Sequence, residues 1–320
     1  MPLATIVSPA RVHPALQRYS GGDSESFVGS WLVKQDRASV VLATKVFFAS
    51  PNGGGLSRPA VLTCVDRSLA RLQTSYIDLY QIHAWDAQTA VEAWMGTMAD
   101  LVRQGKIRAI GVSNVTGWQL QKILSVAESL SVPIASLQLQ YSLLCRDPEL
   151  ELLDCAAFNK VGTLCWSPLK GGWLTGKFKR EEAPAADSRV GKVEAGTVKK
   201  LQSNPSYSQY KDDENVWALL AAMEAVAAAQ QKSVPQVALR WCLQRPTVKA
   251  VVIGVRTPAQ LADNLGASSA DGWELTEAEM ARLNACSMPA VPYPYEMVWR
   301  VSARGAPRQD GNLWPMGYGF

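Results

Sequence analysis

The sequence is poor in the residues that usually build metal sites and disulfide frameworks. It has two histidines, and its six cysteines are scattered without a CxxC pair. A zinc site is not expected, because neither histidine lies near a pair of cysteines. Each cysteine has apolar or helical neighbours, which favours buried thiols in a reducing cytosol over disulfides. The cysteines are Cys64, Cys145, Cys155, Cys165, Cys242 and Cys286.

Long apolar runs and blocks of like charge are missing as well. No stretch is long enough to cross a membrane, and the segment from Met1 to Tyr19 lacks the basic start and apolar run of a secretory signal. The formal net charge is only +4, and no basic block or basic-aromatic stripe favours a nucleic-acid partner. We therefore expect a cytoplasmic protein without a membrane or nucleic-acid partner. The oligomeric state stays open.

A dinucleotide-binding GxGxxG fingerprint is also absent, which argues against a Rossmann domain. What is present is a repeated unit of buried strand, polar end and helix. The stretch from Ser75 to Asp86 is the clearest case, with a strand that ends in His83 and helical patterns before and after it. Strands that alternate with helices predict a parallel sheet, and uniformly apolar strands predict a sheet covered on both faces.

Two arrangements of that sheet compete, a doubly wound open sheet and a (β/α)8 TIM-type barrel. In a barrel the carboxyl ends of all strands gather on one face, where the chemistry takes place. The predicted strands end in a set of polar residues, which favours the barrel. This set consists of Lys45, His83, Asn114, Gln138, Ser167 and Arg256.

We predict one barrel domain over residues 1–320, with three irregular parts. Residues 1–18 form a divergent N-terminus in which 3–7 are compatible with a single strand. Residues 171–215 are a long polar excursion, and excursions of this length are usually functional or mobile. Residues 287–320 are rich in Pro, Gly, Tyr and Trp and predict an irregular tail.

Seven short segments, in order and near strand ends, resemble the aldo-keto reductase family, and in particular its branch that resembles potassium-channel β subunits. Each segment is weak alone, but their order is specific. They are YSGGDSE at 19–25, LATK at 42–45, DLYQIH at 78–83, GKIRAIGVSN at 105–114, QYSLL at 140–144, WSPL at 166–169 and GVRTPAQLADN at 254–264. The resemblance implies the barrel fold, with the first strand-helix unit missing or replaced, since residues 1–18 are too short for it.

The resemblance implies reduction of aldehydes and ketones with NADP(H). Tyr19 would be the general acid, Lys45 would tune it, and His83 would hold the carbonyl oxygen. A phenol starts from a pKa of about 10, a nearby ammonium lowers it, and a positioned acid contributes about 10²–10⁴-fold. Taken alone, these residues are typical of a loop tyrosine, a solvated strand end and a partly buried histidine.

The resemblance also assigns a cofactor site. Ser113, Asn114 and Gln138 would bind the nicotinamide amide, and Trp166, otherwise a core tryptophan, would stack on the ring. A helix beginning at Thr257-Pro258 offers its N-terminus to a phosphate, and an arginine that pairs with a 2′-phosphate favours NADPH. The other implied contacts are Ser167, Leu169 and Gly171 at the pyrophosphate, Lys177 and Arg189 in the excursion, where a solvated loop is the alternative, and Gly254, Arg256, Gln260 and Asn264 at the adenosine end.

One position departs from the family pattern. The family has an aspartate five residues before the tyrosine, where this sequence has Pro14, and the nearest acidic candidate is Asp23. Two further hypotheses therefore stay open beside the reductase, a nicotinamide-binding regulatory protein and an inactive truncated form. His83 favours catalysis because channel β subunits typically have asparagine there, whereas Pro14 favours the regulatory protein.

Overall fold

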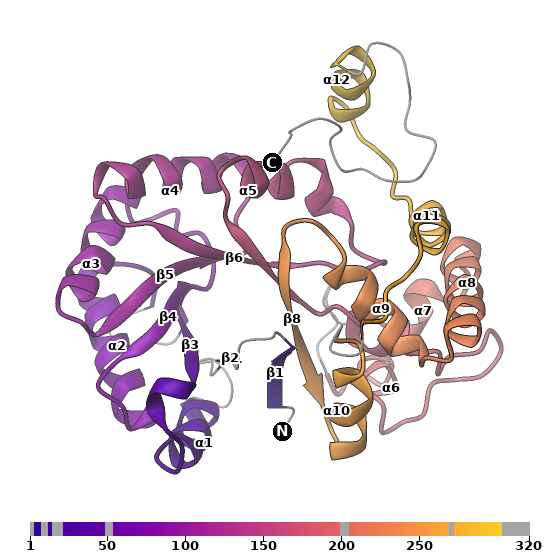
Figure 1. The fold of residues 1–320 in the computed structure, drawn as a ribbon, viewed down its shortest axis with the longest axis horizontal. Helices are drawn as coiled ribbons and strands as arrows, with labels where there is room; N and C mark the ends of the chain where they lie inside the picture. Colours follow the sequence, from indigo (N-terminus) through magenta and orange to yellow (C-terminus); the bar gives the residue numbers. More distant parts are fainter. Residues whose placement is uncertain are drawn as a thin grey trace. The chain divides into compact units, whose positions relative to one another are not determined.

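The computed structural model describes residues 3–7, 12–14, 22–48, 54–198, 205–268 and 272–302. The chain divides into two compact units (Figure 1). The first comprises residues 1–139 and 155–164, and the second comprises residues 140–154 and 165–320. Among the described residues, no helix combines the length and the apolar character that a membrane span requires.

The first unit is built on parallel strands. In order they are β1 (Leu3–Val7), β2 (Val12–Pro14), β3 (Val41–Val46), β4 (Ile77–Ile82), β5 (Ile107–Ser113) and β6 (Ile134–Gln140). Strands β2 to β6 pair with their neighbours in chain order, and every one of these pairs is parallel. Such pairing needs a crossover between successive strands, and helices supply most of these crossovers.

The helices of this unit follow the strands one by one. They are α1 (Asp23–Leu32), α2 (Arg58–Leu72), α3 (Val91–Arg103), α4 (Gly117–Ser129) and α5 (Leu152–Phe158). Figure 1 shows α2 and α3 beside strands β3 to β5. A buried ion pair ties the first two helices to the sheet, because Glu25 on α1 accepts hydrogen bonds from Arg71 on α2 and from Thr44 on β3, at 2.7 and 2.6 Å.

The strands curl around a concave face. The Nζ atom of Lys45 on β3 donates to the Oε1 atom of Gln138 on β6, although β4 and β5 lie between those strands. Across a flat sheet the two strands would be about 14 Å apart. Strong curvature therefore brings the two side chains together, as the predicted barrel requires of this part of the sheet.

The second unit is mainly helical. It contains β8 (Val248–Val255), α6 (Arg189–Glu194), α7 (Tyr207–Tyr210), α8 (Glu214–Gln230), α9 (Val234–Leu243), α10 (Pro258–Leu265), α11 (Glu277–Cys286), α12 (Tyr295–Ser302) and the 3-10 segments Asp147–Leu150 and Lys170–Thr175, while β7 (Gly162–Trp166) crosses the division. The excursion at 171–215 is held by Trp173, which is fully buried and stacks on Tyr207 of α7 at 5.7 Å.

The strand expected at residues 3–7 is confirmed. The prediction for the tail was wrong, since the part expected to be irregular contains α12. Helix α1 begins directly after Gly22, whose left-handed φ of 112° favours glycine.

The cysteine prediction is confirmed for four of the six thiols. All six cysteines are free, and Cys64, Cys145, Cys165 and Cys242 are buried. Cys155 and Cys286 are half-buried, so the prediction of full burial was wrong for these two. Burial raises the pKa of the Cys145 thiol to about 11, which keeps it protonated and unreactive at neutral pH.

Candidate active site

Lys45 is a buried lysine on the concave face of the first unit. It is 4% exposed, so a solvated strand end does not describe it. Its Nζ atom donates to Gln138 Oε1 at 2.5 Å, and no carboxylate of the described residues pairs with it. Burial lowers the pKa of Lys45 to about 7, because the charged form is desolvated without a counter-charge.

His83 follows strand β4 at the same end of the sheet. Its backbone N–H donates to the Val46 carbonyl at 2.9 Å, and its ring meets Phe48 edge-on with centroids 4.9 Å apart. Lys45 lies opposite Gln81 in the register of β3 and β4. Since alternate residues of a strand point to the same face, His83 shares the face of Gln81 and Lys45.

The three residues predicted to bind the nicotinamide amide lie side by side near the carboxyl ends of β5 and β6, with Asn114 directly after β5. Ser113 is opposite Gln138 in the register, and the backbone N–H of Asn114 donates to the Gln138 carbonyl at 3.1 Å. The Asn114 side chain donates to the His83 carbonyl at 2.8 Å and to Ser113 Oγ at 3.1 Å. The Nε2 atom of Gln138 is buried and has no partner among the described residues. In this group of residues, the Gln138 NH₂ group is therefore a buried donor available to a ligand.

A second row of polar residues on the same face was not predicted from the sequence. It lies two residues before Ser113 and Gln138 along β5 and β6. Gln81, Gly111 and Ser136 lie in register on β4, β5 and β6. The Oε1 atom of Gln81 and the Oγ atom of Ser136 are buried without a partner in the described part of the chain. A Cβ on Gly111 would lie 2.7 Å from Ser136 Oγ, so a larger residue would force its neighbours to shift. A glycine inside a strand pattern, which often marks close approach, was the available signal.

The structure describes only some of the predicted catalytic positions near the N-terminus. Pro14 ends β2 and lies opposite Ala43 in the register, two residues before Lys45 on the neighbouring strand. Asp23, at the start of α1, is exposed and forms no ion pair with Lys45 in the described ranges. Tyr19 lies outside the described residues, so its predicted role as the acid is untested.

The remaining predicted cofactor residues belong to the second unit. Trp166 is half-buried at the end of β7, and the loop after it turns with left-handed backbone at Ser167 and Gly171, with φ of 54° and 67°. Lys170, which sequence reasoning did not single out, is 1% exposed, and burial lowers its pKa. The residues Leu169, Lys177, Arg189 and Gly254 range from half-buried to exposed, and Asn264 is 5% exposed.

Arg256 and Gln260 lie together at the start of α10. The Gln260 side chain accepts from the Arg256 backbone N–H at 2.8 Å, and Thr257 caps the helix. The Arg256 guanidinium donates to the carbonyl and the carboxylate of Asp187, at 2.9 and 3.3 Å. The excursion therefore contacts the arginine that the sequence assigned to a 2′-phosphate, and a phosphate there would compete with Asp187.

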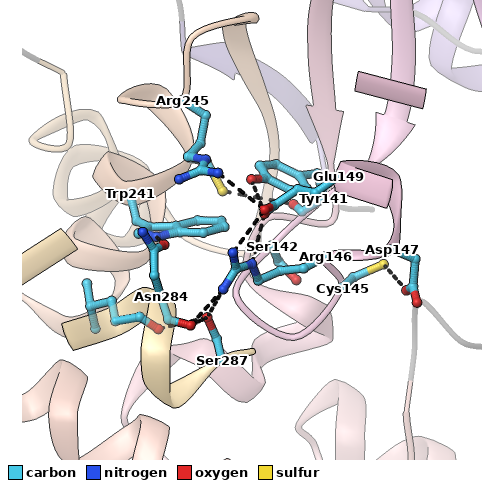
Figure 2. Close-up of polar contacts among 12 residues, drawn as sticks. Tyr141, Ser142, Cys145, Arg146, Asp147, Glu149, Trp241, Arg245, Asn284 and Ser287 are labelled. Atoms are coloured by element: carbon cyan, nitrogen blue, oxygen red, sulfur yellow. Dashed lines mark hydrogen bonds and ion pairs between the residues drawn. The ribbon is translucent and has the colours of Figure 1, made fainter. Parts of the chain in front are cut away.

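A buried ionic network in the second unit was not predicted either (Figure 2). Glu149 accepts two hydrogen bonds from Arg146, one from Arg245 and one from the Tyr141 hydroxyl. Burial alone would raise the pKa of Glu149, but the Arg146 hydrogen bonds and the two guanidinium charges outweigh burial and lower it. Arg146 also donates to the Asn284 carbonyl at 2.7 Å, which fixes this segment to α11. The network is structural, since it lies entirely within packed side chains.

Comparison with known proteins gives consistent similarities. Residues 14–288 match the model of the aldo/keto reductase family. The chain is 35% identical over 258 residues to the "Uncharacterized oxidoreductase YrpG" of Bacillus subtilis (strain 168), covering 78% of this chain and 73% of that protein. It is 32% identical over 270 residues to the "Aldo-keto reductase YhdN" of the same organism, covering 83% and 76%. It is 30% identical over 258 residues to a "Putative voltage-gated potassium channel subunit beta" of Schizosaccharomyces pombe (strain 972 / ATCC 24843), covering 78% and 72%.

Proposed function

The chain belongs to the aldo-keto reductase family, and on that premise we propose that it is an oxidoreductase that reduces aldehyde and ketone carbonyls to alcohols with NADP(H). The observation that carries the proposal is the buried Lys45 on the concave face, next to the strand that leads to His83. A buried amine is costly to maintain, and groups with strongly shifted pKa values cluster where proton chemistry is done.

The proposed roles follow from the chemistry of each group. When bound, NADPH supplies the hydride. Tyr19 donates the proton that the resulting alkoxide needs, Lys45 lowers the pKa of the Tyr19 phenol, and His83 holds the carbonyl oxygen with a ring N–H. An ammonium and a hydrogen-bond donor placed where negative charge develops stabilise it most effectively in a water-poor site.

The residues of the first unit fit a nicotinamide. Its carboxamide needs both donors and acceptors, and Ser113, Asn114 and Gln138 offer both, with Gln138 Nε2 unpaired among the described atoms. The second unit is proposed to hold the phosphates and the adenosine through Trp166, Ser167, Leu169, Gly171, Lys177, Arg189, Gly254, Arg256, Gln260 and Asn264. The preference for NADPH over NADH rests on the Arg256 guanidinium, because a bidentate cation suits a 2′-phosphate.

Three wider statements belong to the same proposal. The fold is proposed to be a single (β/α)8 barrel domain, as the family implies, and the curvature between β3 and β6 within the first unit supports this. The substrate is a small carbonyl compound, as the family implies. The protein works in the cytoplasm, which its free cysteines support, because oxidising compartments favour disulfides.

Replacement of the acid tests the proposal. We expect Tyr19→Phe to abolish turnover of an aldehyde while NADPH affinity stays within a few-fold, because the variant loses only the hydroxyl. Initial rates and the dissociation constant for NADPH, measured by fluorescence, separate the two effects. A variant with the full wild-type rate would contradict the assignment of the acid. Wild-type protein that binds NADPH without turnover would instead support a regulatory role.

A further inference from the structure

The contact between Lys45 and Gln138 fixes the orientation of the Gln138 amide. An ammonium has three donors and no acceptor, so only the carbonyl oxygen of the amide can face it. The structure has this arrangement, with Oε1 toward Lys45 Nζ. The NH₂ group is then directed elsewhere, and its nitrogen has no partner among the described residues although Gln138 is 2% exposed. A buried donor without a partner costs free energy unless something binds it.

In the described ranges no carboxylate pairs with Lys45, so this amide is not redundant. Pro14, which ends the neighbouring strand β2 opposite Ala43, supplies no carboxylate either. In the described part of the chain, Gln138 is the hydrogen-bond partner of Nζ. Burial lowers the pKa of Lys45 to about 7, as expected for a lysine held by a neutral dipole instead of a charge.

We propose that Gln138 is a positioning residue that bridges Lys45 to the nicotinamide carboxamide: its carbonyl oxygen holds Nζ in place of a carboxylate, and its NH₂ group donates to the cofactor. This inference rests on the proposed function. It makes cofactor binding and the state of Lys45 interdependent, since both use one amide. When Lys45 is an ammonium, the amide is locked with NH₂ toward the cofactor. When Lys45 is a neutral amine it also accepts hydrogen bonds, so either end of the Gln138 amide can face it and the orientation is no longer fixed.

The side chains around Lys45 and Gln138 limit which other titrations could make NADPH binding depend on pH. Gln81 on β4, Ser113 on β5 and Ser136 on β6 are neutral, and His83 is the titratable side chain at the end of β4. Tyr19 lies outside the described residues. A comparison of variants that share His83 and Tyr19 therefore isolates the contribution of Lys45 and Gln138.

The test is the dissociation constant for NADPH, measured by fluorescence titration from pH 6 to pH 9, for the wild type, Gln138→Met, Lys45→Met and Lys34→Met. We expect wild-type affinity to fall by several-fold as the pH rises through about 7. Gln138→Met should bind NADPH about tenfold more weakly at pH 6, the cost of one hydrogen bond, and lose this pH dependence. Lys45→Met should lose the same pH dependence, whereas Lys34→Met, which removes an exposed lysine after α1, should keep the wild-type profile.

Gln138→Glu provides a second variant that keeps a partner for Lys45 but removes the donor. We expect weaker NADPH binding from it, together with a pH dependence moved to higher pH, because a carboxylate stabilises the ammonium. Wild-type affinity and profile in Gln138→Met would overturn the bridge, and so would weak binding with the wild-type profile retained. Absence of NADPH binding by the wild type at every pH would overturn the proposed function and the bridge together.

Discussion

At the scale of single residues, the concave face combines one buried charge with neutral neighbours. Lys45, Gln81, Gln138 and Ser136 are at most 6% exposed, and three of the four carry a polar atom with no partner among the described residues. Buried polar groups usually find partners, so this concentration supports the cofactor site proposed above. Two predictions follow from individual positions on this face.

The first prediction concerns the ionisation of Lys45. Its pKa is about 7 when folded, against about 10.4 for an unfolded lysine. Below pH 7 both states hold the proton and the full cost of desolvation is present, whereas above pH 7 only the unfolded chain keeps it, so the free energy of unfolding rises with pH. We expect the stability advantage of Lys45→Met over the wild type to shrink by about 2 kcal/mol between pH 6 and pH 8.5 in urea unfolding.

The range ends at pH 8.5 because thiols and phenols titrate above it. Lys34→Met, at an exposed position after α1, is the matched control and should differ from the wild type by a constant amount. A constant difference for Lys45→Met would show that Lys45 keeps an ordinary pKa in the folded protein.

The second prediction contrasts two glycines. A Cβ at Gly111 would meet Ser136 Oγ at 2.7 Å and Gln81 Cγ at 2.8 Å, whereas a Cβ at Gly96, within α3, would have nothing within 4 Å. We expect Gly111→Ala to reduce the free energy of unfolding by about 1–3 kcal/mol through overpacking. Gly96→Ala should increase it by about 0.5–1 kcal/mol, because alanine is the better helix former. Denaturant unfolding of both variants measures these changes. If Gly111→Ala also increased the free energy of unfolding, the strand would adapt freely at Gly111.

At the scale of secondary-structure elements, sequence patterns predicted local features well and distant contacts poorly. The helix predicted to begin at Thr257-Pro258 is confirmed as α10, with Thr257 as its cap, because such a signal involves only neighbouring residues. The ionic network around Glu149 was missed, because Arg146 and Asn284 are 138 positions apart and nothing in the local pattern links them. Helix α12 was missed as well, because the proline-rich composition around it concealed a short helical segment.

The network leads to the third prediction. Glu149→Gln keeps the shape of the side chain but removes the carboxylate charge that pairs with the buried Arg146 and Arg245 guanidinium groups. We expect a loss of about 3–5 kcal/mol in the free energy of unfolding. Glu151→Gln, two residues later and exposed, should change it by no more than about 0.5 kcal/mol. Similar values for the two variants would mean that the ion pairs contribute nothing beyond shape.

The pH dependence of this network has the opposite sign to that of Lys45. Because the pKa of Glu149 is lowered on folding, its stabilisation is present above about pH 4.5 and is lost as the pH falls through the folded value. Glu149→Gln should therefore show a flatter fall in stability below pH 4.5 than the wild type.

At the scale of the whole molecule, the alternation of strands and helices predicted the parallel sheet, and the polar strand ends predicted which side chains lie together at one end of it. Lys45, His83, Ser113, Asn114 and Gln138 are brought to one end of one sheet, as expected from their positions after apolar strands. The sequence did not predict that Gln138 would contact Lys45, because curvature across β4 and β5 is a property of the assembled sheet. Family membership adds the reaction that these local patterns leave open.

The central claim is that this chain transfers hydride from NADPH to a carbonyl at the site around Lys45. Its most direct test is to mix purified protein with NADPH and an activated aromatic aldehyde and to follow the loss of nicotinamide absorbance between pH 6 and pH 9. The account predicts saturable turnover that falls by at least about 10²-fold in Lys45→Met. NADPH binding without aldehyde-dependent oxidation at any pH in this range would contradict it.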